Sequence, residues 1–535
     1  MKRSVILMAV AVALSLLAGP VSAEVRPHAL FGEHMVLQRD KPIRIYGRAD
    51  AGEKVSVRLG DESGEAVAGA DGAWAVELKA LPAGGPYTLT LSGKNVVEFK
   101  DVLVGDVWVC GGQSNMTIRV GVKNAEKLPG AKEKIRLFRV EGRQLADPQE
   151  ECGGTWVLST PESIAEFSCV GYFFGANLQA ELGIPVGLIN NAVGGTTNQE
   201  WLPHDAYAQT DEGKKFLAKW DAEMEANRKA WSEFAEVKAA YEKAKEAGDK
   251  NAVKPGSPKG FCPMTRYNGW THPLIRFPIK GFAWYQGEWN SGSINGSGPA
   301  EYDKFLPLTI EWYRKLWNDP DMPFLIVQLP NYGNGKTRSD TPLFTGWPNS
   351  QEVQLKTWLK TPHTGLAVTV DIGGALHPGN KDIVGRRLAL AALKVVYGRD
   401  LVYSGPIYKS MAVEGDKVRV TFEHVGGGLV ARDPETKVEG GPLKGFALAG
   451  EDQEFHAAQA AIEGDSVVVS CAAVPKPVAV RYAFHQNPQC DLYNREGLPA
   501  SPFRSDDWPM PGKRRGRPAP AAPAAAAPAP ETPHE

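Results

Sequence analysis

The chain has 535 residues, of which 43% are hydrophobic and 23% charged, and its formal net charge is -2 at pH 7. This length allows several domains, and the composition is typical of a folded globular protein and excludes a largely disordered chain. Because the charge is balanced, the sequence predicts neither a nucleic-acid partner nor an anionic membrane partner.

The first 23 residues have the pattern of a secretory signal peptide. Lys2 and Arg3 precede an apolar run from Val5 to Leu17, and small residues end the segment at Ala23. Since the apolar run is shorter than a bilayer span, cleavage after Ala23 is favoured over a membrane anchor. The mature protein is therefore expected in the periplasm or outside the cell, with no membrane contact after cleavage.

Residues 24–101 carry short runs of alternating apolar and polar residues, such as "IRIYGRA", "KVSVRLG" and "YTLTLSG". Glycine and aspartate turns separate these runs, and the pattern predicts an N-terminal β-sandwich. Residues 402–508 repeat the style and predict a C-terminal β-rich module. The segment 509–535 is rich in proline and alanine, so it cannot build a core and is expected to be a disordered tail.

The pattern changes in residues 102–401. Compact apolar runs such as "GLINNAV", "GFAWYQG" and "FLIVQLP" suit buried parallel strands, and they alternate with helical stretches such as "FFGANLQAEL" and "VGRRLALAALKVVYG". This alternation predicts a doubly wound α/β core.

One insertion, around residues 205–260, interrupts the strand–helix alternation. Leu217, Trp220 and Trp231 recur at helical spacing, which predicts one long amphipathic helix, or two, ending near Gly248. Such a helix either packs on the core through its apolar stripe or forms a lid or a partner surface.

Six cysteines occur without a CxxC pair and at irregular spacing. Cys152 and Cys169 are the pair considered for a disulfide, whereas Cys110 follows an apolar run and is expected to be a buried free thiol. Zinc-ligand spacing is absent and the histidines are scattered, so no metal is predicted.

The segment "GGQSNM" leaves an apolar strand through two glycines and places Ser114 just beyond them. Glycines at a strand exit indicate a tight turn, and the carboxyl ends of parallel strands are where open α/β sheets place their sites. Ser114 is therefore a candidate nucleophile, with helix capping as the alternative role.

Three further motifs follow core strands. Gly194 and Gly195, in "NNAVGGTTNQEW", can bring a backbone N–H close to a substrate oxygen. Gln286 in "WYQGEWN" can donate to an oxyanion. His377 follows a glycine turn after "LAVTVDIGG" and is a candidate general base. Because a doubly wound sheet gathers these strand ends at one edge, the four motifs together predict a serine hydrolase.

The same segments resemble the sialate O-acetylesterase family, within the SGNH-type hydrolases and near the acetylxylan-esterase carbohydrate esterases. The resemblance rests on "VWVCGGQSNM", "GLINNAVGGTTNQEW", "RYNGWTHPLIRFPIKGFAWYQGEWN", "PFLIVQLPNY" and "HPGNKDIVGRRLALAAL". It covers most of residues 25–508, apart from the insertion.

The resemblance implies an SGNH-hydrolase-like core and a reaction without cofactor or metal. Ser114 would be the nucleophile and His377 the general base, and an acetyl-enzyme would form and be hydrolysed. The resemblance assigns the oxyanion hole to Ser114, Gly194, Gly195 and Gln286. The residues expected to bind the sugar are Gln113, Asn115, Arg119, Asn268 and Trp289.

Three positions depart from the family pattern. Gly374 stands where SGNH enzymes often carry an aspartate, three residues before the histidine, so the acid that orients His377 is open. Glu288 is preferred, Asp371 is the alternative, and an unassisted Ser–His dyad is the third reading. Val193 replaces a tryptophan of the glycine block, and Trp289 follows the QGE motif where a serine is common. Both changes are expected to alter the sugar side.

The predicted function is carbohydrate O-acetylesterase, with sialate as the first substrate and acetylxylan or another acetylated polysaccharide as the alternative. Arg119 is a candidate partner for a sialate carboxylate, or else a surface arginine. Two other classes stay open: a non-catalytic carbohydrate-binding protein on this scaffold, and a lipid or thioester hydrolase with an apolar acyl pocket.

Overall fold

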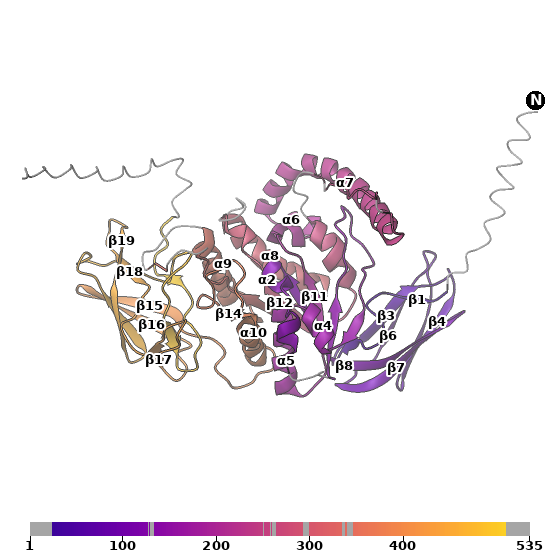
Figure 1. Cartoon of the computed structure of the whole chain (residues 1–535), viewed down its shortest axis with the longest axis horizontal. Coiled ribbons are helices and arrows are strands. Elements are labelled where there is room, and N and C mark those ends of the chain that lie inside the picture. The colour runs from indigo at the N-terminus through magenta and orange to yellow at the C-terminus, as the bar shows by residue number, and fades with distance from the viewer. Residues whose placement is uncertain are drawn as a thin grey trace, which may run out of the picture.

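The structure is a computed structural model that describes residues 24–509 except 127, 129–132, 250, 257, 259–263, 293–298, 334–337 and 340–345. The proposed signal peptide and the tail from residue 510 onward lie outside the described residues. Figure 1 shows an α/β region flanked by two β-rich regions, one formed by the N-terminal part of the chain and one by the C-terminal part.

The α/β region is built on one sheet in the order β10-β9-β11-β8-β12-β13-β14. All neighbouring strands in it run parallel except β10, which pairs antiparallel with β9 at the edge. The strands are β8 (Val96–Gly112), β9 (Ile135–Arg139), β10 (Trp156–Leu158), β11 (Val186–Ala192), β12 (Gly281–Tyr285), β13 (Phe324–Val327) and β14 (Thr364–Ala367).

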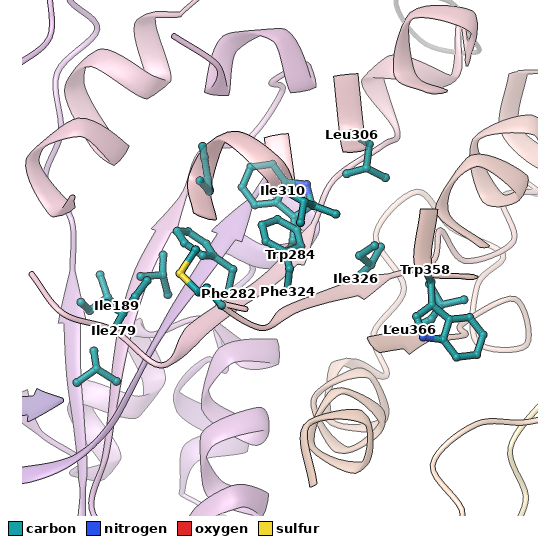
Figure 2. Close-up of a cluster of buried hydrophobic side chains, with 14 of the residues drawn as sticks. Ile189, Ile279, Phe282, Trp284, Leu306, Ile310, Phe324, Ile326, Trp358 and Leu366 are labelled. Carbon is teal, nitrogen blue, oxygen red and sulfur yellow. The ribbon is translucent and has the colours of Figure 1, made fainter. Parts of the chain in front are cut away.

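Helices cover both faces of this sheet, as the compact apolar runs predicted. Phe282 and Trp284 of β12 belong to one hydrophobic cluster, and their neighbours Ala283 and Tyr285 belong to another. Figure 2 shows the first cluster, in which Trp284 lies near Ile310. The first face packs against α8 (Pro299–Leu316) and α9 (Gly346–Lys360), and the second against α5 (Cys169–Leu182) and α10 (Lys381–Val395). This arrangement is the doubly wound core that the strand–helix alternation predicted.

The N-terminal region contains two sets of strands. One is a three-stranded sheet in the order β1-β3-β6, and the other is formed by β4, β5 and β7, which join the central sheet through β8. The proposed boundary near residue 101 therefore falls inside a single 17-residue strand. The strands are β1 (Arg26–Pro27), β2 (Val36–Gln38), β3 (Ile43–Arg48), β4 (Lys54–Leu59), β5 (Glu62–Val67), β6 (Ala73–Leu78) and β7 (Gly84–Ser92). Their description as a β-sandwich stays a prediction.

The C-terminal region is β-rich, with two four-stranded sheets and one two-stranded sheet. Side-chain hydrogen bonds tie it to the core; for example, Ser501 accepts from Gln328 at 2.9 Å and Tyr493 donates to Asp371 at 3.1 Å. The strands are β15 (Ile407–Glu414), β16 (Lys417–Glu423), β17 (Leu429–Ala431), β18 (Phe446–Ala449), β19 (Phe455–Ala457), β20 (Gln459–Glu463), β21 (Ser466–Ser470), β22 (Ala479–Tyr482), β23 (Leu492–Asn494) and β24 (Phe503–Arg504).

The insertion forms α6 (His204–Tyr207) and the 36-residue helix α7 (Asp211–Glu246), which extends away from the core in Figure 1. Phe216 and Leu217, near the start of α7, pack in a cluster with Phe305 and Trp312 of α8. The first turns of α7 are therefore anchored on the core. A role of the remainder as a lid or a partner surface stays a prediction.

The first turn of α7 is closed by a side-chain cap, because the Thr210 hydroxyl accepts a hydrogen bond from the Gly213 N–H at 2.9 Å. We expect Thr210→Ala to lower the free energy of unfolding by about 1 kcal/mol, since that N–H loses its partner. Thr210→Asn keeps an acceptor at the cap and serves as the matched control. Denaturant titration measures both, and equal losses in the two variants would contradict a capping role.

The short helices are α2 (Ser114–Thr117), α3 (Val122–Ala125) and α4 (Pro161–Glu166), with single turns at Asn198–Trp201, Tyr267–Thr271, His272–Leu274 and Trp289–Ser291. Within the described part of the chain, no helix combines the length and apolar character needed to cross a bilayer.

The cysteine pair considered for a disulfide does not form one. Cys152 and Cys169 are both free thiols in the structure, so this possible bridge is absent. Cys110 is buried and free, as its apolar run indicated.

Candidate active site

Three parallel strands end level with one another at the edge that carries the site. Gly112 at the end of β8 pairs with Ala192 at the end of β11 and with Tyr285 at the end of β12. The segments that follow these residues therefore leave the sheet side by side. They contain Ser114, the Gly194–Gly195 pair and Gln286, so three of the four predicted motifs come together.

The two glycines at the exit of β8 are required by close packing. Gly112 has φ +125, and a Cβ there would lie 2.1 Å from the carbonyl oxygen of Tyr285. A Cβ on Gly111 would lie 2.8 Å from the Trp284 ring. A side chain at either position would force neighbouring strands apart, so the chain turns here through glycine.

Ser114 is the first residue of α2, and the residue at the cap position is Gln113, whose side chain makes no cap hydrogen bond. The Ser114 Oγ instead lies 2.9 Å from Nε2 of His377, 263 positions later in the sequence. This distance is that of a hydrogen bond between a hydroxyl and an imidazole. The capping alternative for Ser114 is therefore wrong.

His377 lies on the exposed loop between β14 and α10. Partial burial lowers the pKa of His377, and the positive charge of Lys381 lowers it further. A lowered pKa keeps the imidazole neutral near pH 7, the form in which a ring nitrogen can take up a proton.

The glycine loop after β11 passes beside the serine. A Cβ on Gly194 would lie 3.5 Å from the Cβ of Ser114, so the two backbones are neighbours. Gly195 has φ +72, and a Cβ there would lie 3.6 Å from the Trp289 ring. Trp289 therefore lies close to the glycine loop, at the side where the sequence predicted the sugar.

The side chains of Gln286 and Gln113 join the segments that follow β12 and β8, next to the serine. Gln286 is buried, and its Nε2 lies 2.7 Å from Oδ1 of Asn290 and 3.2 Å from Oε1 of Gln113 and from the Thr196 carbonyl oxygen. The same Gln113 oxygen lies 3.4 Å from the Gly287 N–H. Both amides are engaged inside the protein, and the contacts with an oxyanion and with sugar stay predictions.

Asn115 is fully buried and lies at the centre of a polar cluster. Its Nδ2 donates to Oε1 of Glu288 and, at 3.0 Å, to the carbonyl oxygen of Leu376, the residue before His377. Its Oδ1 accepts a hydrogen bond from Nζ of Lys381. Since both amide atoms are used internally, the expected sugar contact of Asn115 stays a prediction.

Two oppositely charged groups are buried in this cluster. Glu288 and Lys381 are each 1% exposed. Burial raises the pKa of Glu288 to about 7, against the opposing effects of the Asn115 hydrogen bond and the Lys381 charge. Burial also lowers the pKa of Lys381 to about 8, against the opposing effect of Glu288. The sequence did not predict a role for Lys381. Its only signal there is its position four residues after His377.

Asp371, the alternative orienting acid, is engaged elsewhere. Both of its carboxylate oxygens accept hydrogen bonds from Arg387, at 2.6 and 2.8 Å, and one also accepts from Tyr493. Burial raises the pKa of Asp371, but the Arg387 guanidinium outweighs this effect and holds it below its ordinary value. Among the described residues, neither Asp371 nor Glu288 forms a hydrogen bond with His377.

The two other predicted sugar contacts have protein partners. Arg119 is exposed and forms an ion pair with Glu166. Asn268 is buried, and its Nδ2 donates to the carbonyl oxygens of Leu145 and Ala146. Their roles toward substrate stay predictions.

Comparison with known proteins gives matches in sequence and in structure. Residues 104–231 match the family model "Carbohydrate esterase, sialic acid-specific acetylesterase", abbreviated SASA. A crystal structure of a carbohydrate acetylesterase from Xanthomonas citri is similar with a TM-score of 0.75 and 35% identity, covering 90% of this chain and 100% of that one. The sialate O-acetylesterases of Rattus norvegicus and Homo sapiens are 28% and 26% identical, over 88% of this chain and 92% and 90% of their own lengths.

Proposed function

We propose that this chain, which belongs to the SASA family of carbohydrate esterases, removes O-acetyl groups from an acetylated sugar through a serine acetyl-enzyme. The observation that carries the proposal is the 2.9 Å contact between Ser114 Oγ and His377 Nε2 at the carboxyl edge of the parallel sheet. A hydroxyl and a neutral imidazole at this distance form the minimal unit of serine ester hydrolysis.

In the first step, Ser114 Oγ attacks the acetyl carbonyl carbon while His377 takes the hydroxyl proton. The tetrahedral intermediate collapses, the bond to the sugar oxygen breaks, and His377 returns the proton to that oxygen. Water, deprotonated by His377, then attacks the acetyl-enzyme, and acetate leaves as Ser114 recovers its proton. No cofactor or metal takes part in these steps.

We assign the oxyanion hole to the N–H of Ser114, an N–H of the Gly194–Gly195 pair and Gln286. The position of Gly194 beside Ser114 supports the glycine loop as a contributor. The Gln286 side chain donates hydrogen bonds to Gln113 and Asn290, and it would have to exchange one of these partners to donate to the intermediate. An N–H donor aimed at the developing negative charge stabilises the transition state.

We propose Glu288 as the acid that orients His377, with Asp371 as the alternative. The link from Glu288 through Asn115 to the Leu376 carbonyl supports this choice. The engagement of Asp371 by Arg387 and Tyr493 argues against the alternative.

The first candidate substrate is an O-acetylated sialic acid, by analogy with the sialate O-acetylesterases of Rattus norvegicus and Homo sapiens. An acetylated xylan or another polysaccharide is the alternative. Gln113, Asn115, Asn268 and Trp289 are proposed around the sugar, and Trp289 has the strongest support because it lies beside the glycine loop. Arg119 would have to leave Glu166 to meet a sialate carboxylate.

We further propose that residues 1–23 are a signal peptide and that the mature protein is periplasmic or secreted. The proposed regions are the β-sandwich 24–101, the esterase core 102–401 with an insertion around 205–260, the β-rich module 402–508 and the tail 509–535. The strand β8 crosses the boundary at residue 101, so the first of these regions is continuous with the proposed core.

The proposal is tested by acetate release from 4-nitrophenyl acetate, an O-acetylated sialic acid and acetylated xylan. We expect release from at least one acetylated sugar, and a clear preference between sialate and xylan identifies the substrate class. A non-catalytic binding protein would bind sugar without releasing acetate. A lipid or thioester hydrolase would retain activity as the acyl chain lengthens, whereas an acetylesterase loses it.

A further inference from the structure

The polar cluster beneath the serine contains a cation that the reaction itself does not use. Lys381 is the first residue of α10, and its Nζ donates to Asn115 Oδ1 beneath the site rather than extending to solvent. The Nζ also lies 5.1 Å from the centre of the Tyr285 ring. A buried ammonium is costly unless compensated, and its position here therefore needs a reason.

Asn115 connects this cation to both halves of the site. It follows Ser114 directly in the chain, it donates to Glu288, and it donates to the carbonyl that precedes His377. Rotation of the Asn115 amide group would break all of these contacts at once. The orientation of the amide is fixed by the charges at its two ends, because the ammonium faces its oxygen and the carboxylate faces its nitrogen.

We propose that Lys381 is a positioning residue for the esterase reaction, which holds Asn115 and Glu288 in the arrangement that fixes the His377 loop against Ser114. This inference rests on the proposed function and deepens it, since it explains how Glu288 acts on His377 without touching it. The acid acts through Asn115 and the Leu376 carbonyl, and the charge of Lys381 favours the ionised form of Glu288 against the effect of burial.

The charge of Lys381 also reaches the base itself. Its positive charge lowers the pKa of His377, which adds to the effect of burial. The other ionisable groups that face Lys381 are Glu288, the Tyr285 ring and Cys169 at the start of α5. Loss of the cation raises the pKa of His377, so the imidazole becomes protonated at a higher pH.

The test measures kcat/KM for acetate release against pH in Lys381→Met and Lys381→Gln. We expect Lys381→Met to reduce kcat/KM about ten- to hundredfold, the usual cost of losing a hydrogen bond to a charged group. Both variants are expected to move the acid limb of the profile to higher pH, because that limb reports the base of the free enzyme. Lys381→Gln keeps a donor for Asn115, so it separates the charge from the hydrogen bond.

The matched control is Lys394→Met, on the same helix α10, where the lysine pairs with Asp400 at the surface. This variant should retain the wild-type kcat/KM.

In a Glu288→Gln background, Lys381→Met is expected to lower kcat/KM less than it does in the wild type, since the carboxylate that Lys381 faces is gone. An unmoved acid limb together with equal costs in both backgrounds would overturn the proposal. Absence of any Ser114-dependent activity in the wild-type protein would instead overturn the proposed function, so the two failures are distinct.

Discussion

Replacing Ser114 by alanine is expected to reduce acetate release about ten-thousand-fold or more, because the covalent route through the hydroxyl is lost. The substitution removes only the hydroxyl and leaves the backbone turn intact, so binding of an acetylated sugar should persist. The measurement is steady-state acetate release on the best sugar of the substrate panel, with binding followed by calorimetry.

A second variant, His377→Ala, tests whether the two side chains depend on each other. If Ser114 and His377 act as one unit, as their 2.9 Å contact leads us to expect, the double variant should be no slower than either single variant. Ser410→Ala, at an exposed serine that pairs with Thr421 in the C-terminal region, is the matched control and should retain full activity. Additive losses would show that the two side chains work independently, and equal activity in Ser114→Ala and wild type would end the nucleophile assignment.

The sheet and the meeting of Ser114 with His377 could be predicted because both depend on local patterns. Apolar runs bounded by glycine identify buried parallel strands, and the ends of such strands meet at one edge whatever their order in the chain. The turn at Gly112 is a further example, since two glycines after a strand already indicate close packing. The structure adds the reason, which is the Tyr285 carbonyl 2.1 Å from where a Cβ would lie.

The contacts of the buried polar residues could not be predicted in the same way. Whether a lysine such as Lys381 reaches solvent or turns inward depends on residues 93 and 266 positions away, here Glu288 and Asn115. The continuity of the chain across residue 101 could not be predicted for a related reason. One strand, β8, alternates while it lies in the N-terminal sheet and becomes continuously buried when it enters the core, so it reads as two separate elements.

Replacing Asp371 by asparagine is expected to lower the free energy of unfolding by about 3–5 kcal/mol, because it leaves the buried Arg387 without its counter-charge. Asp371 also accepts a hydrogen bond from Tyr493, so part of this loss falls on the attachment of the C-terminal region. Since Arg387 holds the pKa of Asp371 below its ordinary value, this stabilisation is present above the ordinary pKa of about 4 and is lost as the pH falls below it. Denaturant titration of the two proteins, repeated at several pH values, measures the difference.

The same variant decides which acid serves His377. If Asp371 maintains the fold and Glu288 orients the histidine, folded Asp371→Asn should keep kcat/KM within about tenfold of wild type, while folded Glu288→Gln loses activity. An orienting acid replaced by its amide lowers kcat by about ten-thousand-fold in the best-studied serine hydrolases. A loss of that size in Asp371→Asn, measured where the protein is fully folded, would reverse the assignment. The double variant Asp371→Asn/Arg387→Gln is the matched control, because it removes the unpaired charge and should recover stability without restoring a carboxylate.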